Sequence, residues 1–540
     1  MRLRTVSVVV LAACAATAAC SAILDLEPPP IPDDAGAPDA TSGSDAAPND
    51  ATATDAGQDV VSAADGPVQT SDAAVCSPLD AAAPDGATGT TYFSLRDTPV
   101  DDAGTPAWTF YEPSNVNTFA RNFQGGTFDG RYIYLVPNDN GTVTRYDTHG
   151  PFATGASWST FDTTTLAPGA QGFSGAVFDG QFVYFVPYHA PTATYEGLVV
   201  RYDTTASFVG PGGWTAFDLT TLPISDAGTP LVGFNGGVFD GHAVYLVPYY
   251  DGAARLSRVA RYVLDGGVAT PEAGVVDAGD AGDAGAEHDA GDAGAHDAGA
   301  VDAGSMVEAG PPQFGAASQW SAFDMSVPDN NAAGYLGGVF DGRYAYLAPY
   351  ANNAQTSGVV SRYDTTATFA ASSSWSFYDL SALDTDAVGF LGAAFDGRYV
   401  YLVPHVHGVA ARYDTQGPSL AHTPSWTTFD LSEIIANDAG VPTFSGAAFD
   451  GRFVYYVPAT NNGAPSGVVT RYDTWSTFES PCAWSTFDIS TVNASATSYF
   501  GAIYDGQYLY FIPKGTWVAR FDTKTPGAMP ALPAFNGSFY

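Results

Sequence analysis

The sequence predicts an all-β fold, a seven-bladed β-propeller whose blades are four-stranded antiparallel sheets. One sequence unit recurs seven times, at intervals of 50 to 61 residues except for one interval of 101. Each unit contains four short segments with the composition of β-strands, which is the number in a propeller blade. The most regular feature of the unit is an Asp-Gly pair, with the Asp at Asp129, Asp179, Asp240, Asp341, Asp396, Asp450 and Asp505.

The four segments follow each other in a fixed order. A small-residue run ends in Asp-Gly, as in 175–180, and an aromatic run that ends in Pro comes next, as in 398–404. A variable loop leads to the third segment, as in 359–365, and the fourth begins with Trp, as in 426–431. Small residues favour an innermost position, because seven strands crowd around the axis there. We expect each Asp-Gly pair to form the two central residues of a type I′ hairpin turn.

The ends of the chain indicate how the ring closes. The Trp of the fourth segment precedes the first Asp-Gly pair, and no such Trp follows the last third segment. It occurs at Trp108, Trp158, Trp214, Trp320, Trp375, Trp426 and Trp484. We therefore expect the strand at Trp108 to complete the blade whose other three strands are C-terminal, so that both chain ends close the ring.

The N-terminus resembles a bacterial lipoprotein signal. A short basic start is followed by an apolar stretch and small residues before Cys20, so we expect residues 1–19 to be a signal peptide. Lipidation of Cys20, followed by Ser21, implies a lipid-anchored protein of the outer membrane. Cys14 is the alternative lipidation site, and an ordinary secretory signal is the other alternative.

Two segments have compositions that do not support a packed core. Residues 20–89 are rich in Ala, Asp and Pro and contain no aromatic residue, and residues 268–312 repeat Asp-Ala-Gly. We expect a disordered stalk and a disordered insertion, respectively, with the propeller spanning 90–540. The tail 524–540 partly echoes the first segment of the unit but has no predicted place.

The cysteines predict one disulfide. After processing at Cys20, Cys76 and Cys482 remain in the chain. A secreted protein matures in an oxidising compartment, so we expect these two to be bonded to each other. Two free thiols are the alternative.

The charge of the chain excludes one class of partner. The formal net charge is -38, from 57 acidic and 19 basic residues. Phosphate recognition needs clustered Lys and Arg, so we expect no nucleic acid partner. Eleven of the 17 arginines recur at equivalent positions of the unit, which indicates structural roles in pairing with Asp or covering aromatic rings.

The order of motifs resembles the kelch type of propeller. One unit shows the resemblance in Tyr399, Tyr401, Tyr413, Asp414 and Trp426. It departs from kelch where Val-Pro replaces the diglycine and where the gap from Tyr-Asp to Trp is longer. The resemblance implies a kelch-like fold, which is found both in binding modules and in a copper oxidase, so the fold alone does not choose a function.

Candidate ligand residues lie in the loops between the second and third segments, which differ from unit to unit. Tyr, Asn, Asp and His on a rigid scaffold are typical of polar ligand recognition, although solvated loops without function remain the alternative. The residues are Asn138, Asp139, Tyr188, His189, Tyr249, Tyr250, Tyr350, Asn352, His405, His407 and Asn461.

A second set of aromatic residues recurs just before the innermost strand. Its members are Phe123, Phe173, Phe234, Tyr335, Phe390, Phe444 and Tyr499. Packing between blades is one interpretation, and a stacking platform for sugar rings at a channel mouth is the other.

The sequence shows no catalytic motif, and we expect no cofactor and no metal site. His405 and His407 could present two imidazoles on one side of an extended segment, with His189 in a comparable loop, but a transition metal needs three or four ligands. The cysteine of the copper oxidase branch is missing near these residues.

These observations predict a surface-displayed, monomeric, non-enzymatic binding propeller for an extracellular polysaccharide or protein. The alternatives are an extracellular carbohydrate-active enzyme, either a hydrolase or a lyase, and an envelope scaffold without a small ligand.

Overall fold

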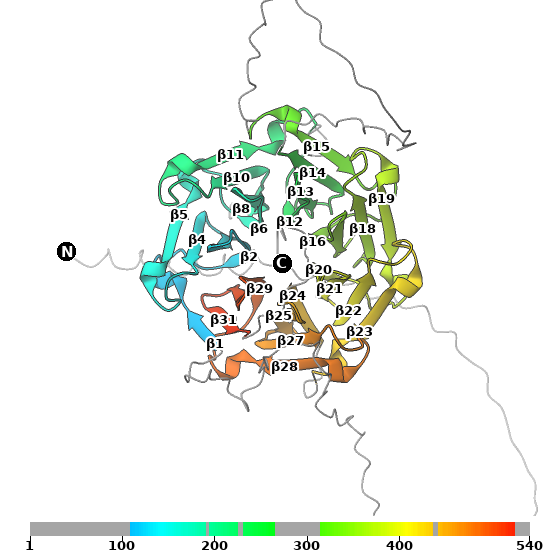
Figure 1. Cartoon of the computed structure of the whole chain (residues 1–540). Coiled ribbons are helices and arrows are strands. Elements are labelled where there is room, and N and C mark those ends of the chain that lie inside the picture. Colours follow the sequence, from blue (N-terminus) through cyan, green and yellow to red (C-terminus); the bar gives the residue numbers. More distant parts are fainter. Residues whose placement is uncertain (1–107, 191–193, 225–229, 265–313, 436–440, 524–540) are drawn as a thin grey trace, which may run out of the picture. The chain divides into compact units, whose positions relative to one another are not determined.

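The computed structural model is a ring of seven β-sheets around a central axis (Figure 1). It describes residues 108–190, 194–224, 230–264, 314–435 and 441–523. The predicted signal peptide, Cys14, Cys20, the stalk, the Asp-Ala-Gly insertion and the tail 524–540 lie outside the described residues. Within those residues the chain forms strands and short 3-10 helices, which confirms the predicted fold class.

Every blade has four antiparallel strands, and the strand order runs outward from the axis. The innermost strands are β2 (Phe123–Phe128), β6 (Phe173–Phe178), β12 (Phe234–Phe239), β16 (Tyr335–Phe340), β20 (Phe390–Phe395), β24 (Pro442–Phe449) and β29 (Tyr499–Tyr504). The second strands are β3 (Tyr132–Pro137), β7 (Phe182–Pro187), β13 (Ala243–Pro248), β17 (Tyr344–Pro349), β21 (Tyr399–Pro404), β25 (Phe453–Asn461) and β30 (Tyr508–Pro513).

The outer half of each blade starts after the variable loop. The third strands are β4 (Thr142–Asp147), β10 (Leu198–Asp203), β14 (Arg258–Val263), β18 (Val359–Asp364), β22 (Val409–Asp414), β27 (Val468–Asp473) and β31 (Val518–Asp522). The outermost strands are β5 (Trp158–Asp162), β11 (Trp214–Asp218), β15 (Trp320–Asp324), β19 (Trp375–Asp379), β23 (Trp426–Asp430), β28 (Trp484–Asp488) and β1 (Trp108–Tyr111). Short strands β8 (His189–Ala190), β9 (Thr194–Tyr195) and β26 (Ala464–Pro465) lie in the loops.

Single-turn 3-10 helices flank the outermost strands. They are η2 (Pro113–Asn115), η3 (Gly155–Ser157), η4 (Thr163–Thr165), η5 (Pro211–Gly213), η6 (Leu219–Thr221), η7 (Ala317–Gln319), η8 (Ser372–Ser374), η9 (Leu380–Ala382), η10 (Thr423–Ser425), η11 (Leu431–Glu433), η12 (Pro481–Ala483) and η13 (Ile489–Thr491). Several are capped by the last Asp of the strand before them, as where Asp379 accepts the Ser381 amide at 3.0 Å. The caps fix the connections between blades.

The ring closes as predicted. β1 pairs with β31 in antiparallel register, with Trp108 opposite Phe521. The N-terminal strand therefore lies in the same sheet as three C-terminal strands, next to β31 in Figure 1. Pairing strands from both ends leaves no gap in the ring, so opening the propeller means breaking a complete ladder.

Two other predictions concern the Asp-Ala-Gly insertion and the disulfide between Cys76 and Cys482. β14 pairs with β15 with Tyr262 opposite Trp320, which confirms that the intervening segment interrupts one blade and does not separate two domains. Cys482, in η12, is disulfide-bonded. Cys76 lies outside the described residues, so the pairing of these two cysteines stays a prediction.

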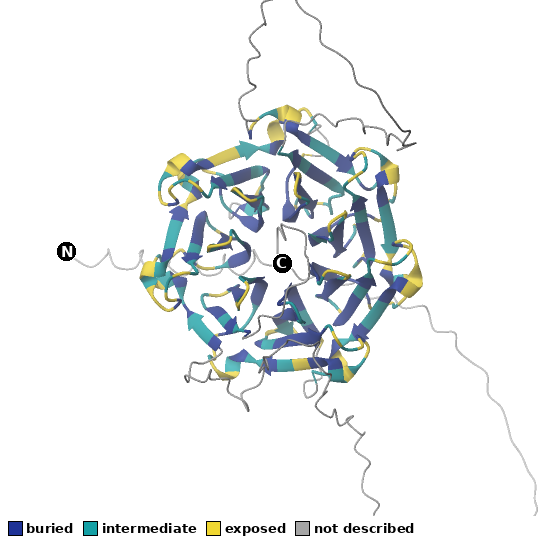
Figure 2. Cartoon of the chain, viewed as in Figure 1, coloured by how far each residue is buried: buried dark blue, intermediate teal, exposed yellow. Residues whose placement is uncertain are grey.

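Aromatic contacts between blades form much of the core, which Figure 2 shows as buried strands around the axis. The Trp that opens an outermost strand stacks on a ring of the neighbouring blade, as for Phe161 and Trp214 with centroids 4.4 Å apart. The aromatic residues predicted just before the innermost strands lie at the beginning of these strands and are at most 1% exposed, Phe173 and Tyr335 among them. They pack between blades, so the alternative of a stacking platform is wrong.

The prediction of a type I′ turn at Asp-Gly is also wrong. In the fifth blade Asp396 pairs with Tyr399, so Gly397 and Arg398 are the central residues, and only the glycine has positive φ, at 101°. This is the place of glycine in a type II′ turn. The Asp is needed before the turn because its Oδ1 accepts the amides of Arg398 and Tyr399 at 2.8 and 2.6 Å. Its Oδ2 accepts the buried Tyr401 hydroxyl at 2.6 Å.

The repeated arginines have the structural roles predicted for them. Arg145, on a third strand, lies over the ring of Tyr132 at 3.9 Å and over Phe208 of the next blade at 4.1 Å. Arg131, after Asp-Gly, pairs with Asp147 at 2.7 Å. Third-strand arginines such as Arg145 contact the next blade, whereas the arginines after Asp-Gly, such as Arg131, connect the second and third strands of one blade.

We predict that Asp396→Ala lowers the free energy of unfolding by about 3 kcal/mol, because two amides and one buried hydroxyl lose a charged acceptor. Asp396→Asn keeps an oxygen for the two amides and costs less. Urea unfolding of the full chain measures both. A change below about 0.5 kcal/mol for the alanine variant would show that the turn does not depend on this carboxylate.

A second prediction uses a difference between two blades. The hydroxyl of Tyr335 is hydrogen-bonded to Ser361, whereas the buried hydroxyl of the equivalent Tyr499 has no partner, because Ala519 replaces the serine. Ala519→Ser should therefore raise the free energy of unfolding by about 1 kcal/mol. Ser361→Ala, the matched control, should lower it by a similar amount. A destabilised Ala519→Ser variant contradicts the pairing.

Candidate functional site

The residue after the Pro of each second strand begins the loops predicted to bind a ligand. These residues are Asn138, Tyr188, Tyr249, Tyr350, His405, Ala459 and Lys514. Their backbone is held in place by the start of the innermost strand, as where the Tyr249 amide donates to the carbonyl of Gly233 at 3.1 Å. Gly233 has a φ of 66°, and a Cβ on it would lie 1.8 Å from the Tyr250 carbonyl oxygen, so only glycine fits. The loops thus start from fixed positions.

Four of the predicted residues form one continuous row across four blades. The ring centroids are 5.7 Å apart for Tyr188 and Tyr249, 5.9 Å for Tyr249 and Tyr350, and 6.0 Å for Tyr350 and His405. Tyr249 and Tyr350 are only 2% and 1% exposed. The prediction that these two lie on an accessible surface therefore needs correction: each ring is almost fully buried against neighbouring aromatic and arginine side chains.

A group of partly exposed rings adjoins this row at its Tyr188 end. We call Tyr188, His189, Tyr195 and Tyr250 the tyrosine patch; all four are partly accessible. His189 is paired with Tyr195 through strands β8 and β9, and their centroids lie 4.6 Å apart. Tyr195 is 5.4 Å from Tyr250 of the next blade. Sequence reasoning missed Tyr195, although its place in a variable loop beside two predicted residues was a usable signal.

Burial sets the protonation of the patch. It raises the pKa of Tyr188 well above the usual range and that of Tyr195 to about 12. It lowers the pKa of His189 below its ordinary value. At neutral pH the two phenols are therefore protonated and His189 is neutral, so the patch offers hydroxyl donors and ring faces.

Sequence reasoning also missed Arg255. Its guanidinium carbon lies 4.7 Å from the ring centroids of Tyr249 and Tyr250 and 5.6 Å from that of Tyr350. It was not singled out because it occurs in one blade only, outside the two repeated arginine positions. Asn353 in the loop of the next blade accepts the Arg255 amide at 2.6 Å and joins the two loops.

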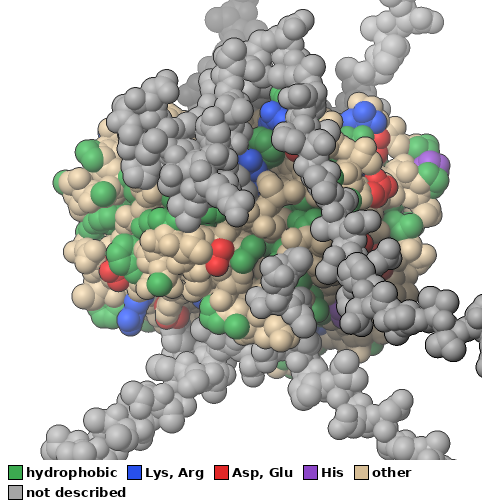
Figure 3. Space-filling view, turned by 90° about the horizontal axis from the view of Figure 1, so that it is seen from below, with side chains coloured by type: hydrophobic (Ala, Val, Ile, Leu, Met, Phe, Trp, Pro, Cys, Tyr) green, Lys and Arg blue, Asp and Glu red, His purple; other side chains and the backbone are tan. Residues whose placement is uncertain are grey.

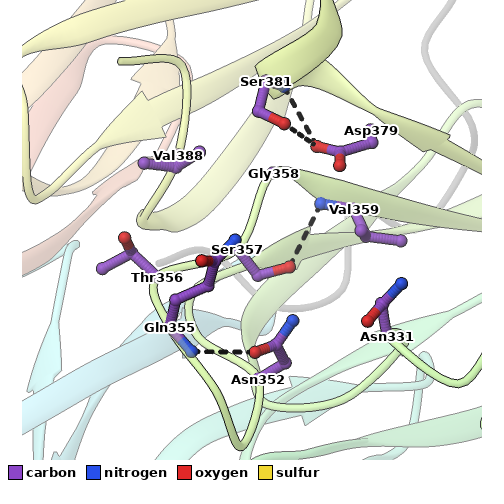
Figure 4. Close-up of a pocket in the computed structure, with 10 residues that line it drawn as sticks. All are labelled: Asn331, Asn352, Gln355, Thr356, Ser357, Gly358, Val359, Asp379, Ser381 and Val388. Carbon is purple, nitrogen blue, oxygen red and sulfur yellow. Dashed lines mark hydrogen bonds between the residues drawn. The ribbon is translucent and has the colours of Figure 1, made fainter. Parts of the chain in front are cut away.

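Asn352 mainly shapes its own turn. Its Oδ1 accepts the amides of Ala354 and Gln355 at 2.9 and 3.0 Å (Figure 4). The hollow beside it has a volume of about 90 Å³, which is room for about three waters and too little for a sugar ring. The carboxylate of Asp379 at its wall is bonded to the amide and hydroxyl of Ser381. This hollow is therefore a by-product of the turn and the cap.

The remaining predicted residues do not join the tyrosine patch. Asp139, next to Asn138 in the first blade, accepts hydrogen bonds from the side chains of Asn122 and Asn140. Asn461 ends β25 in the sixth blade, beside an open groove of about 460 Å³. Each of these lies in a different sector of the ring from the patch.

The two histidines of the fifth blade have separate partners. The Nδ1 atom of His405 is 2.7 Å from the carbonyl oxygen of Phe444, and burial lowers the pKa of His405. The Nδ1 atom of His407 lies 4.0 Å from Asp386. No group of three or more His, Cys, Asp or Glu that could hold a metal ion occurs among the described residues. Those same residues include no helix with the length and apolarity for crossing a membrane.

Basic side chains are sparse on the molecule. On the side seen in Figure 3, Lys and Arg side chains are few, and some of them lie beside Asp or Glu.

Comparisons with known proteins support no narrower assignment. No family model and no curated protein matches the chain, so the kelch resemblance stays a prediction. Among solved structures, virginiamycin B lyase from Staphylococcus aureus is 10% identical, with 77% of this chain and 98% of that one aligned and a TM-score of 0.46. YCF48 bound to D1 peptide is 11% identical over 79% and 97%, with a TM-score of 0.43. YCF48 from Cyanidioschyzon merolae is 11% identical over 77% and 99%, with a TM-score of 0.42. Similarity at this level carries no argument about function.

The structure predicts different costs for two neighbouring tyrosines. Tyr249→Ala should lower the free energy of unfolding by about 3–5 kcal/mol, because it removes a buried ring. Tyr250→Ala should cost less than about half of that, because its ring is half-exposed. Urea unfolding of the two variants measures the difference, and equal losses would contradict the burial that separates the rings.

Proposed function

We propose that this chain is a non-enzymatic binding propeller that recognises an extracellular polysaccharide through the tyrosine patch. The observation that carries the proposal is a set of partly accessible aromatic rings, contributed by two blades and held in mutual contact. Sugar rings have apolar faces that stack on aromatic rings, and the protonated phenols can hydrogen-bond to sugar hydroxyls. Fixed loops lower the entropic cost of binding.

Two of the acidic side chains at these loops, Asp251 and Asp379, are engaged by backbone amides, whereas burial raises the pKa of Glu196 beside Tyr195. Asp251, in the same loop as Tyr250, accepts the amides of Ala253 and Ala254 at 2.8 and 2.7 Å. Asp379 caps a 3-10 helix in the same way. A hydrolase needs two carboxylates that are free to exchange protons with the substrate. A carbohydrate-active enzyme, a protein-binding module and an envelope scaffold are the alternatives to the proposal.

The location proposed for this activity is the outer membrane. A lipid on Cys20 would hold the chain there, and residues 20–89 would separate the propeller from the membrane surface. Such a position suits a domain that meets large extracellular polymers.

The test is a glycan array with the full chain and with the double variant Tyr195→Ala, Tyr250→Ala. We expect the variant to lose at least about tenfold in apparent affinity, because both rings supply the stacking surface. Phe119→Ala is the matched control, since Phe119 is a 58% exposed aromatic residue outside the patch. Unchanged glycan binding by the double variant, or equal losses in the control, refutes the proposed site.

A further inference from the structure

Among the described residues, Arg255 forms no ion pair with a carboxylate, although the protein is strongly acidic. Arginines after the Asp-Gly turns, such as Arg343, pair with a carboxylate at 2.7–2.8 Å. In the part of the chain that the structure describes, no carboxylate lies within 4.0 Å of the Arg255 guanidinium, which rests instead on the rings of Tyr249, Tyr250 and Tyr350. Besides these ring contacts, the guanidinium is hydrogen-bonded to the side chain of Tyr249, which is neutral and does not compensate its charge.

Two blades fix the backbone from which this side chain extends. Residues 251–254 form a tight turn, with Gly252 at a φ of 97°, and Tyr250 is bridged to Arg255 across it. From the next blade, the side-chain amide of Asn353 accepts from the Arg255 amide at 2.6 Å and donates to the Arg255 carbonyl at 3.3 Å. The backbone is thus held from both sides and the guanidinium lies against three rings, which lowers the freedom to be lost when an anion binds.

We propose that Arg255 binds the carboxylate of a uronate unit, so that the polysaccharide recognised by the tyrosine patch is an acidic one. This inference rests on the proposed function and names the chemical class of its ligand. A planar guanidinium can donate two parallel hydrogen bonds to a carboxylate. The half-buried position strengthens such an ion pair relative to one in open water.

A uronate fits because the two parts of the site are contiguous. The ring centroid of Tyr250 lies 4.7 Å from the guanidinium carbon of Arg255 and 5.4 Å from the ring centroid of Tyr195. One sugar ring carrying a carboxylate therefore finds a stacking face and a cation at adjacent positions. An acidic peptide would supply the charge without the flat apolar face that the patch favours.

The test compares two probes that differ only in charge. Isothermal titration calorimetry of the full chain is run with an oligogalacturonate and with its neutral methyl ester. We expect the acid to bind at least about tenfold more tightly, and Arg255→Gln to remove that preference. Arg255→Lys keeps the charge without the planar donor pair and should retain part of the preference. Arg343→Gln is the control, because Arg343 lies at the opposite end of β17 from the loops and pairs with Asp364.

The outcomes separate this inference from the proposed function. If the methyl ester binds the wild type as tightly as the acid, or if Arg255→Gln keeps the preference, the inference is overturned while binding through the patch stands. Binding of neither probe also overturns it, and the glycan array then decides the proposed function separately. Thermal unfolding checks that each variant is folded. If Arg255→Gln does not fold, the preference of Arg255→Lys for the acid over the ester is used instead.

Discussion

The stacked aromatic contact between the outermost strands of neighbouring blades holds the ring together. A Trp of one blade meets an aromatic ring of the blade before it at every junction, from Tyr111 on Trp158 at 4.8 Å to Phe487 on Trp108 at 5.7 Å. Such pairs contribute about 0.5–1.5 kcal/mol each beyond the burial of their surface. The last contact spans the closure, because Trp108 belongs to the N-terminal strand. Every loop position on the ring depends on this closed scaffold.

The repeated polar residues complete the scaffold and are therefore not available for a ligand. The Asp of each Asp-Gly pair is used by two backbone amides and a buried phenol, as at Asp396. Each third-strand arginine lies over at least one aromatic ring, and four of the seven, Arg145 among them, lie between rings of two blades. The Asp and Arg side chains that recur in the blades thus have their partners within the propeller. Arg255 has no counterpart in the other blades, which separates it from this set.

Sequence patterns predicted the fold well because the signals were repeated. Trp108 could be assigned to the C-terminal blade because seven units needed seven such residues. The turn type was predicted wrongly because the sequence Asp-Gly does not show whether Asp is a central residue of the turn or the residue before it. The hydrogen bonds of the Asp side chain to the two following amides decide that, and they are visible only in the structure.

The site was predicted only in part, and the reason is also physical. Sequence reasoning identified the variable loops, so Tyr188, His189 and Tyr250 were found. Whether a tyrosine in such a loop is accessible depends on the side chains of neighbouring blades that pack against it, and a single sequence does not reveal these. Tyr249 and Tyr350 are buried for that reason. Arg255 was missed because its contacts, with three tyrosine rings and one asparagine, come from two different blades and are visible only in the structure.

The asymmetry of the loops explains why the site occupies one sector. Tyrosines follow the Pro in the second, third and fourth blades, whereas the other four blades have Asn138, His405, Ala459 and Lys514 at that position. Buried Tyr249 and Tyr350 then form a floor that links these blades, and the half-exposed rings and Arg255 rest on it. A rigid floor matters because partly exposed aromatic rings bind well only when their orientation is set before the ligand arrives. Under the proposed function, the buried part of the row therefore acts indirectly, by holding in place the partly exposed side chains of the tyrosine patch.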